Sequence, residues 1–173
     1  MALVDLHLHT TASDGCLTPT QLIHFVARRG LKFVAITDHD TTNGLAEAFS
    51  AAQDYPELTI IPGIELSADI PGDEVHLLGY YLDHHNEVFQ HTLHQFRRGR
   101  ETRARQMVNK LAEFDVHIQW NRVVELAGDG AVGRPHIARA MVEKNYVSDL
   151  REAFDLYLSR NGPAYVERNK LTP

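Results

Sequence analysis

The sequence is poor in cysteine: Cys16 is the only cysteine among 173 residues. A single cysteine excludes an intrachain disulfide, and it suits a reducing compartment such as the cytoplasm. The chain also lacks an excess of positive charge, because 17 lysines and arginines face 23 aspartates and glutamates. The resulting net charge of −6 excludes a globally basic nucleic-acid-binding protein, although it leaves room for a local basic site.

Long apolar runs, a secretion signal, internal repeats and low-complexity tracts are missing as well. No apolar run reaches the roughly 20 residues that a membrane-spanning helix needs, and the amino-terminal stretch does not have the features of a signal peptide. We therefore expect a cytoplasmic protein. A chain of 173 residues, 43% of them hydrophobic, can build the core of one domain with a small insertion.

Two histidines share one face of the first predicted strand. Residues 3–8 are mostly apolar, which predicts a buried strand. Because side chains alternate between the two faces of a strand, His7 and His9 point the same way, roughly 6.6 Å apart along the backbone. Neutral imidazoles bind metal ions near pH 7. A bare His-x-His pair is more often two half-exposed strand residues, so the metal hypothesis depends on the residues at the ends of the later strands.

A strand–helix–strand unit comes next. Thr18 and Pro19 mark the start of a helix, and Gly30 marks its end. Residues 31–37 then predict a second buried strand that leads directly into His39. Such a unit has parallel strands, so both strands end at the same edge of the sheet. We therefore expect His39 to lie near the two histidines of the first strand.

The same pattern repeats further along the chain. Residues 43–53 predict a short helix, residues 58–64 a third strand that leads to Glu65, and residues 75–80 a fourth strand with His76 near its start. Plain loops would favour glycine, asparagine and serine at strand ends, whereas this chain has metal-ligand residue types there. The sequence therefore predicts a site at the carboxyl edge of the sheet.

The chain after the fourth strand has a helical pattern. We assign the loop 83–86, with its two histidines, to solvent. Apolar spacing then predicts one or two helices over 88–114, a helix around 137–142 and another over 150–158. Strand-like runs are missing from this stretch, which indicates a helical subdomain inserted into the α/β frame. Residues 164–166 favour a return to that frame.

Several ordered motifs resemble those of the PHP family, the polymerase and histidinol phosphatase metallohydrolases. They are Asp5-Leu6-His7-Leu8-His9-Thr10, Ser13-Asp14-Gly15, Thr37-Asp38-His39-Asp40, Pro62-Gly63-Ile64-Glu65 and Val75-His76. Two further motifs, Leu17-Thr18-Pro19 and Gly133-Arg134-Pro135-His136, resemble one branch of that family. Its members are nucleoside 3′,5′-bisphosphate phosphatases, some of which act as 5′→3′ exoribonucleases on short RNA.

The resemblance implies a fold class and a domain organisation. The implied fold is α/β, the N-terminal part of a distorted (β/α)7 barrel of the PHP type with an inserted all-helical subdomain. Residues 1–87 would form the first βα units with the metal-binding rim, residues 88–162 a helical insertion that caps the site, and residues 163–173 a return to the barrel. A whole barrel of this type needs on the order of 250 residues. The rest of the barrel, with the family's Ala-His-Pro and late Asp-x-His ligands, is therefore expected beyond Pro173.

The resemblance also implies a centre of two or three divalent metal ions, with Mn²⁺ expected first and Fe²⁺ or Zn²⁺ as alternatives. His7 and His9 would hold the first ion, Glu65 would bridge it to a second ion that His76 also binds, and Asp14 and His39 would hold a third. Glu65, His39 and Asp14 would act in catalysis through these ions. Asp38 and Asp40 flank His39 and are candidates to orient the ligands. The alternative is that each aspartate caps a helix or a turn.

A local basic cluster stands out in this acidic chain. Five arginines lie close together on the predicted helix: Arg97, Arg98, Arg100, Arg103 and Arg105. Arg100 and Arg103 share a helix face, and guanidinium groups bind phosphate in bidentate fashion. These two arginines, together with Arg134 and His136, are candidates to hold the phosphate that is not being cleaved. The alternatives are a solvated helix face and an ordinary N-cap loop.

These observations lead to one functional hypothesis with two alternatives. The hypothesis is a metal-dependent phosphoesterase that hydrolyses a phosphate monoester of nucleoside 3′,5′-bisphosphates, and RNA 5′ ends, by a metal-activated hydroxide. Its partners would be a small phosphorylated substrate or short RNA, and no membrane. The alternatives are a small-metabolite phosphatase of the histidinol-phosphate type and a non-catalytic PHP metal-binding module.

Overall fold

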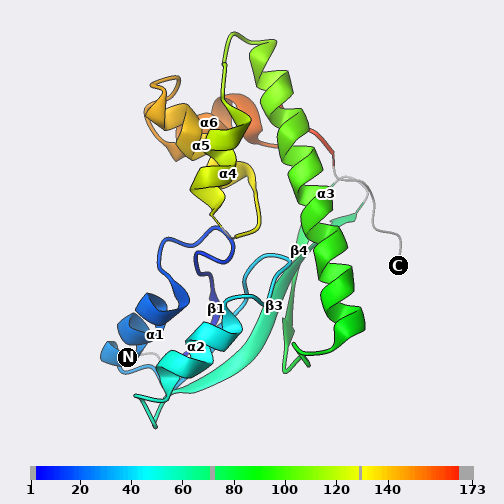
Figure 1. Ribbon diagram of the computed structural model, residues 1–173. Coiled ribbons are helices and arrows are strands. Elements are labelled where there is room, and N and C mark those ends of the chain that lie inside the picture. The colour runs from blue at the N-terminus through cyan, green and yellow to red at the C-terminus, as the bar shows by residue number, and fades with distance from the viewer. Residues whose placement is uncertain (1–2, 71–72, 129, 168–173) are drawn as a thin grey trace. The chain divides into compact units, whose positions relative to one another are not determined.

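The computed structural model describes residues 3–70, 73–128 and 130–167. Its elements are β1 (Val4–Leu8), α1 (Pro19–Arg28), β2 (Phe33–Ile36), α2 (Leu45–Ala52), β3 (Thr59–Ile70), β4 (Asp73–Tyr80), α3 (Glu87–Ala112), α4 (Trp120–Ala127), α5 (Arg134–Glu143), α6 (Leu150–Ala153) and the π-helix η1 (Phe154–Leu158) (Figure 1). The chain forms two compact units. The first runs to Phe96 and includes Ala131, and the second comprises Arg97–Gly128 and continues from Val132. Because the boundary falls within α3, this helix contributes residues to both units.

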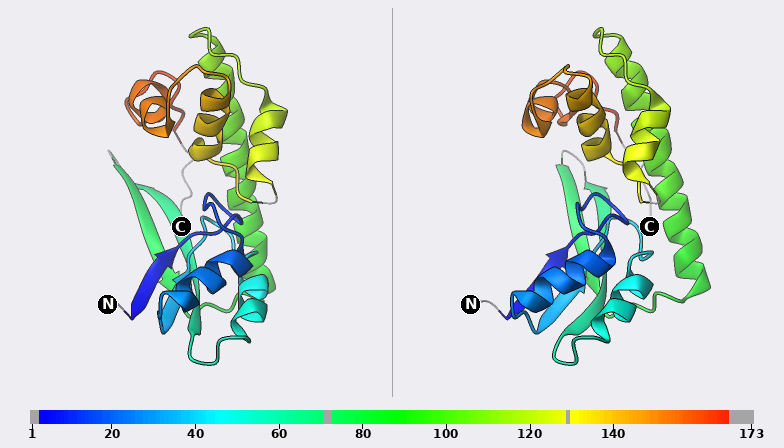
Figure 2. Two further views of the ribbon diagram at one scale, coloured as in Figure 1. Left: turned by 90° about the vertical axis from the view of Figure 1, so that its left-hand side faces the viewer. Right: turned by 60° about the vertical axis from the view of Figure 1, so that its left-hand side comes forward.

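A four-stranded sheet in the order β1-β2-β3-β4 forms the frame of the first unit. β1, β2 and β3 are parallel neighbours, with Val34 opposite Ile60. This pairing confirms the strand–helix–strand arrangement predicted from the sequence. β3 also pairs with β4 in antiparallel fashion, and Figure 2 shows these two strands as a long, curved hairpin. The described strands thus form the curled sheet of an α/β fold.

Helices α1 and α2 cover one face of the sheet in the first unit. Thr18 caps α1, because its Oγ1 accepts a hydrogen bond from Gln21 N–H over 3.2 Å while Gln21 Oε1 accepts from Thr18 N–H over 3.0 Å. This reciprocal capping box, followed by Pro19, starts the helix where the sequence predicts it. The core between helices and sheet consists of apolar residues that include Leu22, Ile23, Val26, Val34, Ile36, Leu45, Ala48 and Ile60.

The third strand is longer than the sequence predicts. A strand over 58–64 would end before Glu65, whereas β3 continues past this residue. A glycine often marks the end of a strand, but Gly63 lies within β3. It allows β3 to approach β2 closely, because a Cβ at this position would lie 2.8 Å from Ile36 O. Beyond Gly63 the partner is β4, with Glu65 opposite Leu78. This hairpin pairing extends the strand and places Glu65 within it.

Helices make up the second unit, and its described residues contain no strand. α3 is one continuous helix where the sequence predicts one or two, and α5 matches the helix predicted around 137–142. The helix predicted over 150–158 is divided into α6 and η1, and α4 was not predicted. The core of this unit includes Met107, Leu111, Val123, Ile137, Met141 and Leu158. None of the described helices combines the length and the apolar character that a membrane crossing requires.

The last described residues belong to the second unit. The sequence places residues 163–173 in a return to the barrel. Ala164 and Tyr165 are buried in the helical core of the second unit. The end of this segment, residues 168–173, lies outside the described residues.

Candidate metal centre

Glu65 lies at the centre of a group of histidines in the first unit. Its side chain is buried, and its Oε2 accepts a hydrogen bond from His7 Nε2 over 2.8 Å and lies 2.9 Å from His9 Nε2. His76 Nδ1 donates to the other oxygen, Oε1, and His39 Nδ1 lies 3.8 Å from Oε2. One carboxylate therefore faces imidazoles from the end of β1, from the segment after β2 and from β4.

Backbone pairing explains why His39 meets Glu65. The two residues form an isolated parallel bridge beyond the end of β2. Asp40 N–H donates to Glu65 O over 3.0 Å, and Glu65 N–H donates to Asp38 O over 3.3 Å. Asp40 has a φ of +52°, in the left-handed region that aspartate adopts more readily than most residues. The chain therefore turns away directly after it has placed His39 beside the carboxylate.

Asp14 supplies a second carboxylate to the same group. Its Oδ1 lies 3.2 Å from His9 Nδ1, and its Oδ2 lies 3.7 Å from His39 Nε2. The rings of His9 and His39 are 4.8 Å apart. Each of these two rings thus directs one nitrogen towards Asp14 and the other towards Glu65.

The six residues predicted as metal ligands converge in three overlapping groups. The groups are His7–His9–Glu65, His9–Asp14–His39 and His39–Glu65–His76, and within each group the candidate ligand atoms lie within 4.8 Å of one another. Imidazole nitrogens combined with carboxylate oxygens suit Mn²⁺, Fe²⁺ and Zn²⁺. This donor set and its spacing fit a cluster of divalent ions.

The electrostatics of the group favour a bound cation. Burial would lower the pKa of the His9 imidazole, but the hydrogen bond to Asp14 and the charges of nearby carboxylates raise the pKa above its ordinary value of 6.5. Burial would raise the pKa of the Glu65 carboxyl, but the hydrogen bond from His7 and the other histidines lower the pKa below 4.5. Folding thus stabilises a carboxylate anion and positive charge beside it.

A second buried carboxylate, Asp38, has partners that the sequence did not reveal. Its Oδ1 accepts hydrogen bonds from Thr10 N–H over 2.7 Å and from Ser13 Oγ over 2.6 Å, and its Oδ2 accepts one from Thr10 Oγ1 over 2.7 Å. The sequence offers Asp38 only as a candidate to orient ligands or cap a turn, and it assigns no role to Thr10 and Ser13. These hydroxyls are separated from Asp38 by 28 and 25 positions, so the fold was needed to identify the pairing.

The residues predicted to bind a substrate phosphate lie in the second unit. Arg103 is buried, its Nε donates to Val166 O over 2.6 Å, and its guanidinium carbon lies 4.9 Å from the ring centre of Tyr165. The guanidinium carbon of Arg134 lies 6.0 Å from the same ring. Arg103 is therefore not part of a solvated helix face. By contrast, Arg105 is exposed.

Arg100 and His136 lie beside Gly133, at the start of α5. Gly133 N–H donates to His136 Nδ1 over 3.0 Å, and the His136 side chain is buried. Arg100 Nη1 lies 3.9 Å from the position that a Cβ on Gly133 would occupy. The structure thus gathers the four predicted residues around Tyr165 and the N-terminal end of α5.

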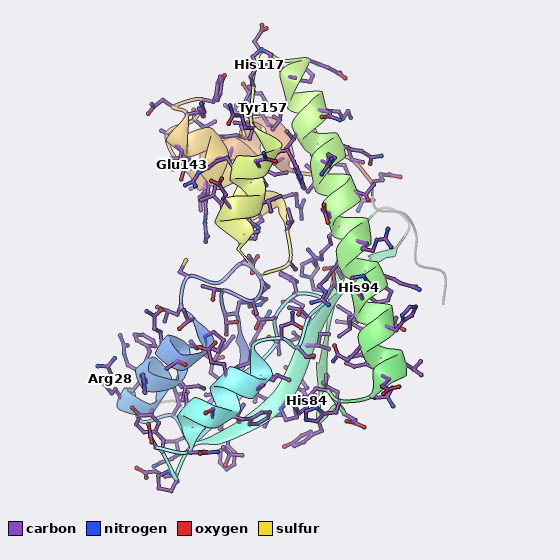
Figure 3. The ribbon with its side chains drawn as sticks, in the orientation of Figure 1. Arg28, His84, His94, His117, Glu143 and Tyr157 are labelled. Carbon is purple, nitrogen blue, oxygen red and sulfur yellow. The ribbon has the colours of Figure 1, made fainter. Side chains whose placement is uncertain are left out.

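Several other histidines lie outside the three groups found among the described residues. Figure 3 labels three of them: His84 after β4, His94 on α3 and His117 after α3. The ring of His84 packs 5.6 Å from Phe49 and 4.1 Å from His85, so His84 is only half-exposed. Its burial and the charge of His85 lower the pKa of His84. The assignment of this loop to solvent is correct for His85 and needs correction for His84.

The sequence of this chain is similar to those of known phosphoesterases and to a family model. The model of the PHP domain family matches residues 5–169. The chain is 37% identical over 172 residues to a 3′,5′-nucleoside bisphosphate phosphatase of Chromobacterium violaceum, with 96% of this chain and 58% of that protein covered. It is 35% identical over 165 residues to the 5′-3′ exoribonuclease Rnm of Salmonella typhimurium, with 95% and 56% covered.

A solved structure shares the fold over almost the whole chain. It is a predicted metal-dependent phosphoesterase from Bifidobacterium adolescentis, with a TM-score of 0.89 and 33% identity over 96% of this chain and 59% of that one. The chain therefore spans somewhat more than half the length of each of these proteins.

Proposed function

Because the chain belongs to the PHP domain family, we propose that it is part of a metal-dependent phosphoesterase that acts on nucleoside 3′,5′-bisphosphates and on RNA 5′ ends. The observation that carries this proposal is the convergence of His7, His9, Asp14, His39, Glu65 and His76 in three ligand groups with atoms within 4.8 Å. Four imidazoles and two carboxylates in such proximity form a donor set for more than one divalent ion.

The site residues have separate roles in this proposal. Glu65 would bridge two ions, because its two oxygens face different histidines, His7 and His76. Asp14 would complete a third group with His9 and His39. Bound divalent ions, Mn²⁺ first among them, would withdraw charge from the phosphoryl oxygens and acidify the attacking water. The negative carboxylates would hold the ions and would keep the surrounding imidazoles in fixed orientations.

The choice of substrate is supported by the arginines of the second unit. Arg100 and Arg134 carry guanidinium groups near the start of α5, and each can offer paired N–H donors to a phosphate. We propose that these arginines, with His136, hold the phosphate that is not cleaved. The buried Arg103 would support them through its contacts with Tyr165 and Val166. Two points stay predictions: residues 88–162 form an insertion that caps the site, and the whole barrel has seven βα units.

The test is hydrolysis by the purified chain with added Mn²⁺, measured as phosphate release and, for the RNA, also as release of nucleoside 5′-monophosphates. A nucleoside 3′,5′-bisphosphate, a nucleoside 5′-monophosphate, histidinol phosphate and a 5′-phosphorylated short RNA are compared at equal concentration. We expect the bisphosphate and the RNA to be hydrolysed and chelation by EDTA to abolish the activity. Preference for histidinol phosphate would contradict the proposed substrate class. A lack of hydrolysis of all four, with Mn²⁺ bound, would contradict catalysis by this chain.

A further inference from the structure

Asp38 is a buried carboxylate at the end of β2 that faces the loop between β1 and α1. It is 1% exposed, and three hydrogen bonds of 2.6–2.7 Å converge on it from Thr10 N–H, Thr10 Oγ1 and Ser13 Oγ. A buried carboxylate needs donors that replace its lost water. Here those donors come from one short loop, so Asp38 fastens residues 10–13 to the end of β2.

These contacts lie directly beside one of the three ligand groups, His9–Asp14–His39. The sequence neighbours are Thr10 and His9, Ser13 and Asp14, and Asp38 and His39. Every ligand of this group is thus next to a residue of the Asp38 network. In the other two groups, Glu65, His7 and His76 belong to strands, and the sheet itself fixes their positions.

The rest of the loop is folded closely around the same point. Ser13 N–H and Gly15 N–H both donate to Thr10 O over 3.0 Å. A Cβ on Gly44 would lie 3.0 Å from Thr10 Oγ1 and 3.1 Å from Asp38 Oδ2. The space around the carboxylate is therefore filled, and a side chain at position 38 has little freedom to change its partners.

We propose that Asp38 is a positioning residue that sets the geometry of His9, Asp14 and His39 and thereby the affinity of this one group for a divalent ion. It does so by fastening the loop rather than by binding the ion, a role that depends on the proposed metal-dependent function. The groups built on Glu65 share His9 and His39 with this group, but they depend less on this fastening, because His7 lies on β1, Glu65 on β3 and His76 on β4.

In the main experiment, the metal-free chain is titrated with Mn²⁺, and calorimetry measures the binding of each ion. The Mn²⁺ equivalent that is lost in Asp14→Asn is the one bound by the His9–Asp14–His39 group. We expect Asp38→Asn to weaken that equivalent about 10- to 100-fold, the usual effect of removing a partner that orients metal ligands. The other equivalents should weaken much less, because each keeps two ligands that the sheet holds. In the double variant, Asp38→Asn should add little to Asp14→Asn.

Asp40→Asn is the matched control. Asp40 is also buried and adjoins His39 from the other side, but its Oδ1 accepts from Ser67 N–H over 3.4 Å, away from the loop. Asparagine also tolerates its left-handed backbone. We expect Asp40→Asn to keep the Asp14-dependent ion. The proposal would be overturned if Asp38→Asn weakened the binding of all Mn²⁺ ions equally, or if it left every Mn²⁺ affinity unchanged. It would also be overturned if the effects of Asp38→Asn and Asp14→Asn on Mn²⁺ affinity were fully additive.

A second measurement uses milder variants and no metal. Thr10→Val removes one hydroxyl donor at nearly constant size, whereas Thr10→Ser retains it. Hydrogen exchange of the loop amides should accelerate in Asp38→Asn and in Thr10→Val but not in Thr10→Ser, and unchanged exchange in both would overturn the fastening role. If the wild-type chain binds no Mn²⁺ at all, the proposed function fails, while the exchange rates still decide whether Asp38 holds the loop.

Discussion

His9 and His39 each lie between two carboxylates, and this placement determines the chemistry of the candidate metal centre. Each ring directs one nitrogen towards Asp14 and the other towards Glu65. Protons and metal ions compete for such nitrogens, because a histidine ligand must be neutral at the nitrogen that binds the metal. For His9, the same contacts that would support an ion therefore raise the pKa of the ring and stabilise its protonated form in the metal-free chain.

This competition predicts a pH-dependent stability for the metal-free chain. Folding raises the pKa of His9 above 6.5, so its contribution is fully present below about pH 6.5 and is lost as the pH rises through the raised value. The pKa of Glu65 is lowered, so its contribution is present above about 4.5 and is lost as the pH falls through the lowered value. The difference in free energy of unfolding between wild type and His9→Asn should therefore be largest near about pH 5–6 and shrink towards pH 9. Urea denaturation in a chelator measures it, and a difference that grows with pH would contradict the prediction.

The arginines of the second unit predict a selective loss of activity. A charged hydrogen bond contributes about 1.5–3 kcal/mol, so Arg100→Ala and Arg134→Ala should lower kcat/KM for a nucleoside 3′,5′-bisphosphate roughly ten- to hundredfold. A monophosphate has no second phosphate to hold, so its hydrolysis should change little. Arg105→Ala is the matched control on the same helix as Arg100, because Arg105 is exposed and lies 4.8 Å from the ring centre of Trp120.

Equal losses on both substrates would place Arg100 and Arg134 at the cleaved phosphate or in the fold instead. Arg103→Ala is a poor test of phosphate binding, since it also removes the hydrogen bond to Val166 O and the contact with Tyr165.

At the scale of elements, the local signals in the sequence predicted the helices with caps and the parallel strands. α1 begins where Thr18 and Pro19 indicate, because a capping box is encoded within four residues. α4 was not predicted, and its N-cap, Gln119, makes no side-chain capping bond. The extension of β3 depends on pairing with β4, and the packing of Arg103 depends on Tyr165, 62 positions away in sequence. Neither contact leaves a pattern within the residues of a single strand or helix.

Two glycine substitutions test the packing of these elements with opposite signs. Gly63→Ala should lower the free energy of unfolding by about 1–3 kcal/mol, because its Cβ would lie 2.8 Å from Ile36 O and force β3 away from β2. Gly99→Ala should raise it by about 0.5–1 kcal/mol, because Gly99 is exposed on α3 with nothing within 4 Å of a new Cβ. Thermal or urea unfolding of both variants measures these changes. A Gly63→Ala variant as stable as wild type would contradict the close approach of β3 and β2.

For the whole molecule, the sequence places His7, His9, His39 and Glu65 at strand ends, and the resemblance to the PHP family adds Asp14 and His76. The structure brings all six together in the first unit. That much was predictable because parallel strands end at a common edge. The sequence could not show how Asp38 holds the loop between β1 and α1, since hydroxyl and carboxylate pairings depend on tertiary structure. The chain spans 56–59% of the length of the relatives to which we compared it.

The most direct test of the metal centre is the Mn²⁺ content of wild type and Glu65→Gln after equilibrium dialysis, measured by elemental analysis. Glutamine keeps the shape of the side chain but removes the charge that would hold two ions. Glu47→Gln is the matched control, because Glu47 is exposed and binds Thr20 in α1. We expect two or three Mn²⁺ ions per chain in wild type and in Glu47→Gln, and at most the one ion of the His9–Asp14–His39 group in Glu65→Gln. An unchanged Mn²⁺ content in Glu65→Gln would contradict a metal centre built on Glu65.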